Sequence, residues 1–336
     1  MRVPVALVDR SLEQRKEPGM MYPGESAKLT RLTRSKSSMK TDSQIRIGIA
    51  GWRYDGWRGA FYPEDLPQRR ELEFASQRLN SIELNGSFYS LQRPKSFQQW
   101  SAETPDDFVF SVKGTRFITH IRQLENVETP LANFLAQGLL RLGRKLGPIL
   151  WQFPPTFKFD AQRMQAFFEL LPRTHKQAAA YARQRDQWME NRSWLEVEED
   201  LPLRHAVEFR HKSFAVPEYI ELLRKYGIAI VVADTPEWPC LMDTTADFVY
   251  CRLHGSEKLY ASGYDAEAID KWAHRVIAWS RGEEVTDGTK AHPEPGPKRD
   301  SRDVFVYFDN DVKVRAPFDA QSLSKRIDEL SGPNGT

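Results

Sequence analysis

The chain has 336 residues, with 48 Lys and Arg side chains against 46 Asp and Glu, so its formal net charge is +2. This balance argues against a general nucleic-acid binder, which is normally visibly basic. Two cysteines exclude a disulfide framework and a zinc finger, and no apolar run approaches the roughly 18 residues that span a bilayer. The first residues lack the long apolar segment of a secretory signal. We therefore expect a cytoplasmic protein that makes no use of a membrane.

The first 43 residues differ from the rest of the chain. They hold nine basic and five acidic side chains, many Ser and Thr, and little apolar periodicity. Such a composition predicts a mobile basic tail over 1–43, followed by a single domain over 44–332. The alternative is an arm that touches RNA or a membrane surface, although charge runs are usually only solvated.

Short β-rich runs alternate with longer amphipathic stretches from residue 45 onward. Several of the runs are almost continuously apolar, as in a parallel sheet that is covered on both faces. The expected strands are 45–50, 81–85, 108–113, 149–153, 205–209, 228–233, 248–253 and 304–308. The expected helices are 69–79, 130–145, 161–171, 217–226, 266–281 and 320–330.

Eight strand–helix units over about 290 residues predict a (β/α)₈ TIM barrel, an α/β fold. The competing architecture is an open doubly wound sheet. The turn after the first strand, GWRYDGWRG, is not the GxGxxG loop of a nucleotide-binding sheet and so does not favour this alternative. Two insertions interrupt the repeat: 175–200 is charged and helical in character, whereas 283–303 is rich in Pro and Gly and predicts a loop or a disordered segment.

Polar residues collect at the carboxyl ends of the expected strands, where TIM barrels carry their chemistry. Because residues two apart on a strand face the same way, alternation assigns the following side chains to the barrel mouth: Glu83, Asn85, Ser111, Lys113, Gln152, Glu208, Arg210, Asp234, Arg252, His254, Asp309 and Asn310. They could pair among themselves to satisfy the mouth. Opposite charges around the whole ring favour a ligand site instead.

Aromatic residues also follow the strands, with Trp52 after the first and Tyr89 after the second. Such side chains could stack on a sugar or a base, or they could belong to the core.

Seven segments of the chain resemble successive signatures of the YecE-like family, domain of unknown function 72. They are GIAGWRYDGWRGAFYP, SIELNGSFY, FVFSVKGTRFITH, LGPILWQFPPTF, HAVEFRHKSF, DFVYCRLHG and VFVYFDND. The resemblance implies a TIM barrel and no particular reaction. It covers Trp52, Glu83, Asn85, Tyr89, Lys113, His120, Gln152, Glu208, Arg210, Asp234, Arg252, His254 and Asn310. At Gly86 the family pattern suggests a polar residue, so one ligand contact is in question.

The leading hypothesis is an enzyme, such as a hydrolase, that acts on an anionic or phosphorylated small molecule. Its predicted catalytic residues are Glu208 or Asp234 as general base and His254 as acid or base. Arg and Lys side chains would neutralise the anion. The predicted substrate-binding residues are Trp52, Glu83, Asn85, Tyr89, Lys113, Gln152, Arg210, Arg252 and Asn310.

Three alternatives remain open. In a metal-dependent, nuclease-like hydrolase, Glu208, Asp234, His254 and His120 would hold one divalent ion, although the sequence itself requires no cofactor. In a glycosidase, two carboxylates would lie at a set separation. A non-catalytic barrel would bind a small ligand or nucleic acid, because fold alone does not decide function.

Overall fold

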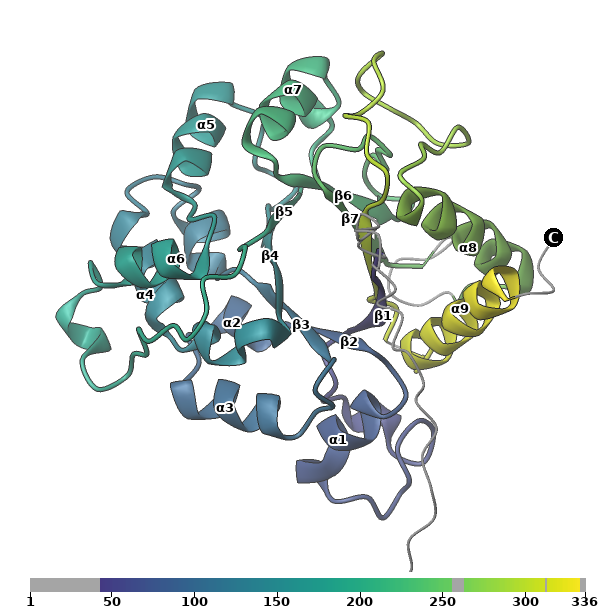
Figure 1. The fold of residues 1–336 in the computed structure, drawn as a ribbon, viewed down its shortest axis with the longest axis horizontal. Coiled ribbons are helices and arrows are strands. Elements are labelled where there is room, and N and C mark those ends of the chain that lie inside the picture. The colour runs from purple at the N-terminus through teal and green to yellow at the C-terminus, as the bar shows by residue number, and fades with distance from the viewer. Residues whose placement is uncertain (1–42, 256–262, 312, 333–336) are drawn as a thin grey trace, which may run out of the picture. The chain divides into compact units, whose positions relative to one another are not determined.

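Residues 43–255, 263–311 and 313–332 are described by a computed structural model of the chain. Within them, eight strands form a closed barrel in chain order, and β8 pairs in parallel with β1 to close it (Figure 1). The strands are β1 Ile45–Ala50, β2 Ser81–Leu84, β3 Val109–Lys113, β4 Leu146–Gln152, β5 His205–Glu208, β6 Ala229–Asp234, β7 Phe248–Leu253 and β8 Asp303–Phe308. The predicted TIM barrel is confirmed, and the open doubly wound sheet is wrong. The predicted tail, apart from Ser43, lies outside the described residues.

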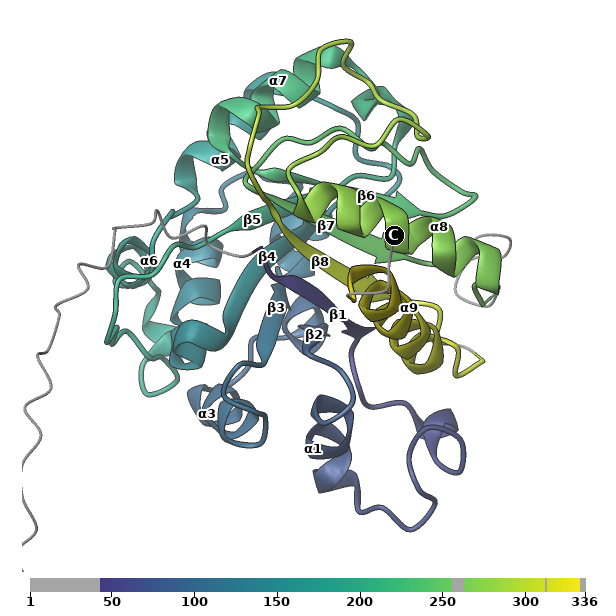
Figure 2. The same cartoon turned by 45° about the vertical axis from the view of Figure 1, so that its right-hand side comes forward.

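Helices surround the barrel. They are α1 Glu71–Ser76, α2 Gly86–Tyr89, α3 Pro94–Ala102, α4 Glu128–Ala136, α5 Ala161–Leu170, α6 His175–Ala182, α7 Pro217–Tyr226, α8 Ala266–Ser280 and α9 Ala316–Ser331. The last two lie side by side and cover β8 and β1 (Figures 1 and 2). Among the described residues, none of the helices combines the length and the apolar character that a bilayer crossing requires.

The helix predicted over 130–145 differs from the observed structure. Helix α4 ends at Ala136, and a separate 3₁₀ segment, Leu139–Lys145, follows it. Gly138 separates the two with φ of +115°, and a Cβ at this position would lie 2.5 Å from the Cα of Pro94. Left-handed backbone and close approach both require glycine, so this residue ends the helix.

The two insertions have different structures. The first begins with α6, whose amino end is capped by the Thr174 hydroxyl. The second is a loop, and the Asp243 carboxylate holds it by accepting hydrogen bonds from the backbone N–H groups of Ala291 and His292 at 2.8 and 3.0 Å. Helices α2 and α3 were not predicted from the sequence.

Alternate strand residues divide between two cores. Outward side chains such as Trp151 are buried among helix residues, here the rings of Phe134 and Phe167. Inward side chains are apolar at the amino end of the barrel and become polar toward the carboxyl end of the strands. The change begins where the hydroxyls of Tyr250 and Tyr307 meet those of Ser111 and Ser81, each at 2.7 Å. The barrel interior therefore carries its polar groups toward the carboxyl end of the strands.

Candidate functional site

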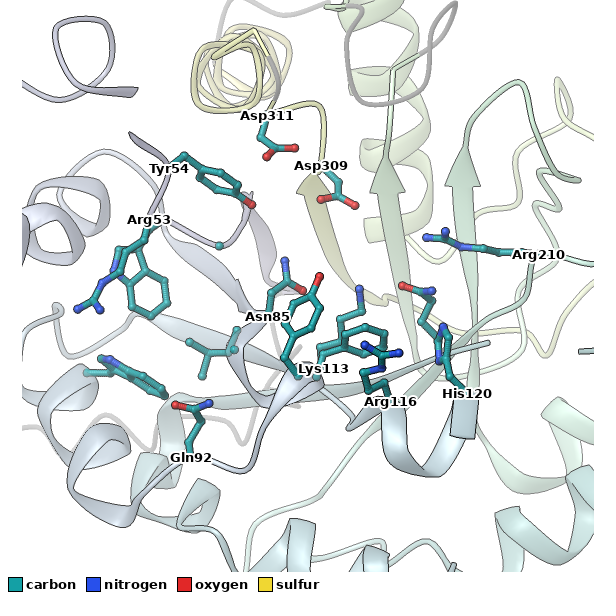
Figure 3. A pocket seen from close by; sticks show the side chains of 18 residues that line it. Arg53, Tyr54, Asn85, Gln92, Lys113, Arg116, His120, Arg210, Asp309 and Asp311 are labelled. Atoms are coloured by element: carbon teal, nitrogen blue, oxygen red, sulfur yellow. The ribbon is translucent and has the colours of Figure 1, made fainter. Parts of the chain in front are cut away.

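A cavity of about 820 Å³ opens at the carboxyl ends of β1 to β5 and β8 (Figure 3). We call it the mouth cavity. Its lining residues are Gly51, Trp52, Arg53, Tyr54, Leu84, Asn85, Gly86, Phe88, Tyr89, Gln92, Trp100, Lys113, Arg116, His120, Gln152, Arg210, Asp309 and Asp311. Its position at this end of the barrel is the one at which TIM-barrel enzymes carry their active sites.

The exit from β1 brings aromatic side chains to the mouth cavity. Gly51 turns the chain with φ of +89°, and its N–H donates to the carbonyl of Glu83 at 2.9 Å. The next residues, including Trp52 and Tyr54, then line the cavity. Burial and the charges of Asp309 and Asp311 raise the pKa of Tyr54 far above its usual range. Its hydroxyl therefore stays neutral and donates to the carbonyl of Ala50.

Lys113 is a buried cation at the end of β3. It is 8% exposed, and its amine lies 4.5 Å from the centre of the Phe88 ring. Among the residues that the structure describes, no carboxylate oxygen lies within 4.0 Å of this amine. Burial and the positive charge of Arg252 lower the pKa of Lys113 to about 8. The amine is therefore still mostly charged at neutral pH, yet it has no direct ion pair within the described chain.

Two arginines and a histidine stand near Lys113 in the lining (Figure 3). Arg116 is exposed, whereas Arg210 is largely buried and donates from Nε to Glu208 at 2.8 Å. Burial and the positive charges of Lys113 and Arg210 lower the pKa of His120 to about 4. His120 is consequently a neutral hydrogen-bonding group at pH 7.

Two carboxylates from the segment after β8 also line the mouth cavity, and their acidities differ. Burial alone would raise the pKa of Asp309, but Arg252 at 2.8 Å and His254 at 3.1 Å outweigh it and lower the value to about 2. Burial and the negative charge of Asp309 raise the pKa of Asp311 to about 6. Asp309 is therefore a fixed anion, whereas Asp311 can gain and lose a proton near neutrality.

A buried ion network lies next to the mouth cavity, inside the barrel. Arg252 is fully buried and donates to Glu83 through two nitrogens, at 3.0 and 3.1 Å, and to Glu208 at 2.6 Å. Tyr250 donates a further hydrogen bond to Glu83 at 2.6 Å. Burial alone would raise the pKa of Glu208, but the charges of Arg252 and Arg210 hold it well below its usual range.

This network contains four of the predicted site residues, Glu83, Glu208, Arg252 and His254, and none of them lines the cavity. His254 is fully buried, with its Nδ1 beside Asp309 and its ring edge against Trp238. These four residues are therefore buried behind the residues that line the cavity, and their role is structural.

Two predicted site residues turn away from the mouth, so the prediction that they face it is wrong. Asp234 accepts a hydrogen bond from the indole of Trp272 on α8 at 3.2 Å. Asn310 donates to Asp319 on α9 at 2.8 Å. Alternation explains both cases, because Asp234 lies one residue after the inward Ala233 and Asn310 three residues after the inward Tyr307, so both face the helices.

The residues predicted to bind a metal do not come together. Asp234 faces the outer helices, whereas Glu208 and His254 face the barrel interior. In the described ranges, no group of three or more His, Cys, Asp or Glu side chains is arranged to hold a metal ion.

Seven predicted residues line the mouth cavity, namely Trp52, Asn85, Tyr89, Lys113, His120, Gln152 and Arg210. Strand alternation also assigned Asp309 to the mouth, without a particular role, and this residue lines the cavity, whereas Asp311, Arg116 and Trp100 were not predicted. Asp309 and Asp311 share the parity of Tyr307, which is a signal that the sequence carries. Arg116 lies on a loop and Trp100 on α3, where strand alternation predicts nothing.

At Gly86, which departs from the family pattern, the structure shows why a small residue fits. A Cβ here would lie 3.3 Å from Nε2 of Gln92, which itself donates to the carbonyl of Ser90 at 2.9 Å. The missing side chain thus leaves room for the Gln92 carboxamide on the cavity wall.

Residues 46–334 match the model of a family described as protein of unknown function DUF72. The chain is 25% identical over 304 residues to UPF0759 protein YunF of Bacillus subtilis, which covers 86% of this chain and 96% of that protein. It is 27% identical over 113 residues to UPF0759 protein YecE of Escherichia coli K12, 34% of this chain and 39% of that one.

Solved structures show the same architecture. A DUF72 family protein of Thermotoga maritima, TM1631, aligns with a TM-score of 0.61 and 25% identity over 85% of this chain and 99% of its own. A DUF72 family protein of Enterococcus faecalis, EF0366, aligns with a TM-score of 0.59 and 18% identity over 85% and 96%. The second likeness supports the fold alone.

Proposed function

The chain belongs to the DUF72 family, whose function is unknown, and from the geometry of its mouth cavity we propose that it binds a small phosphorylated molecule there and acts on it as a hydrolase. The observation that carries the proposal is the buried amine of Lys113, which lines the cavity with no carboxylate within 4.0 Å in the described part of the chain. A buried charge without a partner is unfavourable. A bound anion would supply the missing partner.

The neighbouring groups suit phosphate. Arg116 and Arg210 add two cations to the same lining, and a guanidinium presents the forked N–H pattern that matches phosphate oxygens. The amide of Gln152 and neutral His120 can add hydrogen bonds. Asp309, a fixed anion of the same lining, is already compensated by Arg252 at 2.8 Å, and Arg210 is paired with Glu208 at 2.8 Å, so Lys113 and Arg116 carry the remaining positive charge. The lining therefore keeps an excess of positive charge for the ligand.

The same cavity holds a group suited to proton transfer. Two carboxylates whose pKa values are pushed apart are the usual mark of an acid paired with a permanently ionised group. In hydrolysis of a phosphate ester, water attacks phosphorus and its oxygen and protons leave on the phosphate product. The bond from phosphorus to the leaving oxygen breaks, and Asp311 gives its proton to that oxygen and regains one from solvent. This role replaces those predicted for Glu208, Asp234 and His254, which lie outside the cavity lining.

Isothermal titration of inorganic phosphate and pyrophosphate into the full chain tests the binding. We expect wild-type protein to bind pyrophosphate and Lys113→Met to bind it at least about tenfold more weakly, because a charge-assisted contact contributes about 1.5–3 kcal/mol. The matched control is Lys325→Met, which removes an 80% exposed lysine on α9 and should bind as wild type. Failure of wild type to bind either anion would refute the proposal.

Turnover tests the role of Asp311. Asp311→Asn should slow hydrolysis of alkyl phosphates far more than that of p-nitrophenyl phosphate, whose leaving group needs no proton. Equal slowing of both substrates, or no turnover of either by wild type, would contradict the proton-transfer role and leave the anion site as a binding site.

A further inference from the structure

The mouth cavity is much larger than the anion that its cations would hold. At about 820 Å³ it falls in the range of cavities that bury whole drug-sized ligands, and a phosphate group would fill only a small part of it. The remaining space can therefore hold a second part of the same ligand.

The wall on the β1 and β2 side is aromatic. Trp52, after β1, packs edge-on against Trp100 of α3 with ring centres 5.6 Å apart, and both line the cavity. Tyr89, at the end of α2, also lines it and is 71% exposed. An aromatic ring this exposed at a cavity rim is an available stacking surface.

Figure 3 separates the two ends of the cavity. Lys113, Arg116, His120 and Arg210 lie toward one side, whereas Arg53 and Gln92 lie toward the other. The cationic end is built by the residues after β3 and β5, and the aromatic end by those after β1 and β2. One elongated ligand can therefore reach both.

Besides the exposed guanidinium of Arg53, the polar groups of the aromatic end are few. Within the described part of the chain, the buried carboxamide oxygen of Asn85 has no hydrogen-bond partner, and Gln92 lies in the space that Gly86 leaves. The hydroxyl of Tyr54 already donates its hydrogen bond to the carbonyl of Ala50. A further sugar ring at this end, in place of a base, would bring several hydroxyls, each costly to bury unpaired, whereas a nucleobase offers flat faces for stacking and polar atoms only at its edges.

We propose that the phosphorylated ligand is a nucleoside monophosphate, with its phosphate beside Lys113 and its base stacked on the aromatic wall of Trp52 and Tyr89. This inference rests on the proposed function and adds the ligand class. The carboxamides of Asn85 and Gln92 would then meet the edge of the base, as amide side chains commonly do in nucleotide recognition.

The experiment is a titration of the full chain with four nucleoside monophosphates, ribose 5-phosphate, glucose 6-phosphate and inorganic phosphate. We expect at least one nucleotide to bind tenfold or more tightly than ribose 5-phosphate, because stacking of one base is typically worth ~1–3 kcal/mol. Tyr89→Ala, an exposed change that the fold tolerates, should lower nucleotide affinity toward that of ribose 5-phosphate and leave inorganic phosphate binding unchanged. Trp52→Leu should do the same.

The matched control is Trp188→Ala, which removes a 55% exposed indole from the first insertion and should change nothing. Sugar phosphates that bind as tightly as every nucleotide would overturn the nucleotide inference and leave the phosphate site standing. So would a Tyr89→Ala variant with wild-type nucleotide affinity. If no phosphate compound binds wild type, the proposed function itself fails.

Discussion

The ion network inside the barrel and the lining of the mouth cavity use the same residue types in opposite ways. In the network, Arg252 is surrounded by Glu83, Glu208 and Asp309, all within 3.1 Å. In the lining, Lys113 is nearly as buried but has no carboxylate within 4.0 Å in the described chain. Buried charge that is paired holds a structure together. Buried charge without a partner marks the place where a ligand belongs.

The largest effect should come from breaking the network. Arg252→Met would leave three carboxylates in a buried site without their common cation, and breaking a buried pair in this way costs about 3–5 kcal/mol. Chemical denaturation should show this loss in the free energy of unfolding. Arg116→Met, at an exposed cation of the lining, should change it by less than about 0.5 kcal/mol. A loss below about 1 kcal/mol for Arg252→Met would contradict the structural role of the network.

Replacing a buried cation of the cavity lining by Met should not lower the free energy of unfolding, in contrast to the same replacement in the ion network. Lys113→Met removes a desolvated amine that has no ion pair within the described residues, so the ligand-free protein should be as stable as wild type or more stable, by up to about 1 kcal/mol. The measurement is again chemical denaturation, without anions in the buffer. If this variant is clearly less stable, Lys113 belongs to the structural network and the contrast fails.

The pH dependence of anion binding should sharpen the contrast further. Sulfate keeps its charge across the range and is a suitable probe. The pKa of Asp311 is raised to about 6, so the cavity gains a negative charge as pH rises through 6 and sulfate should bind more weakly. The pKa of Lys113 is lowered to about 8, so a positive charge is lost as pH rises through 8 and binding should weaken again. His120, with a pKa of about 4, stays neutral over both steps.

Titration calorimetry across this range separates the two groups. Asp311→Asn should abolish the step near pH 6 and keep the one near pH 8, whereas the residual binding of Lys113→Met should lack the upper step. A flat profile for wild type would show that neither group faces the bound anion.

The pH dependence of the free energy of unfolding, measured without ligand, also tests the lowered pKa of Lys113. Because the folded pKa of Lys113 lies below its unfolded value, the unfolded state binds more protons between about pH 8 and the ordinary lysine pKa, and the contribution of this group to stability rises with pH in that window. Lys113→Met should remove this rise.

Strand alternation was sufficient to predict much of the site. On β2, β3, β5 and β7 the polar residues share one parity, and Asn85, Lys113 and Arg210 reach the cavity as expected. The prediction was wrong for Asp234 and Asn310 because residues 229–233 and 304–308 are apolar on both faces, so the sequence did not show which parity of these strands faces inward. Sequence alone did not reveal that Trp272 of α8 would bind Asp234.

The division between paired and unpaired charges could not be predicted from the sequence. Glu83 and Asn85 are two residues apart on one face, yet the first lies in the buried ion network and the second on the cavity wall. Only the depth of each side chain along the barrel axis decides this, and depth depends on the register between neighbouring strands. The roles predicted for Glu208 and His254 changed for the same reason.

The most direct test of the central claim is a crystal structure of the full chain grown with pyrophosphate. We expect density for the anion in the mouth cavity, with an oxygen within about 3 Å of the Lys113 amine and with Arg116 or Arg210 beside it. An anion bound elsewhere with the cavity unoccupied, or Lys113 in a direct ion pair with one of the chain's own carboxylates, would contradict it.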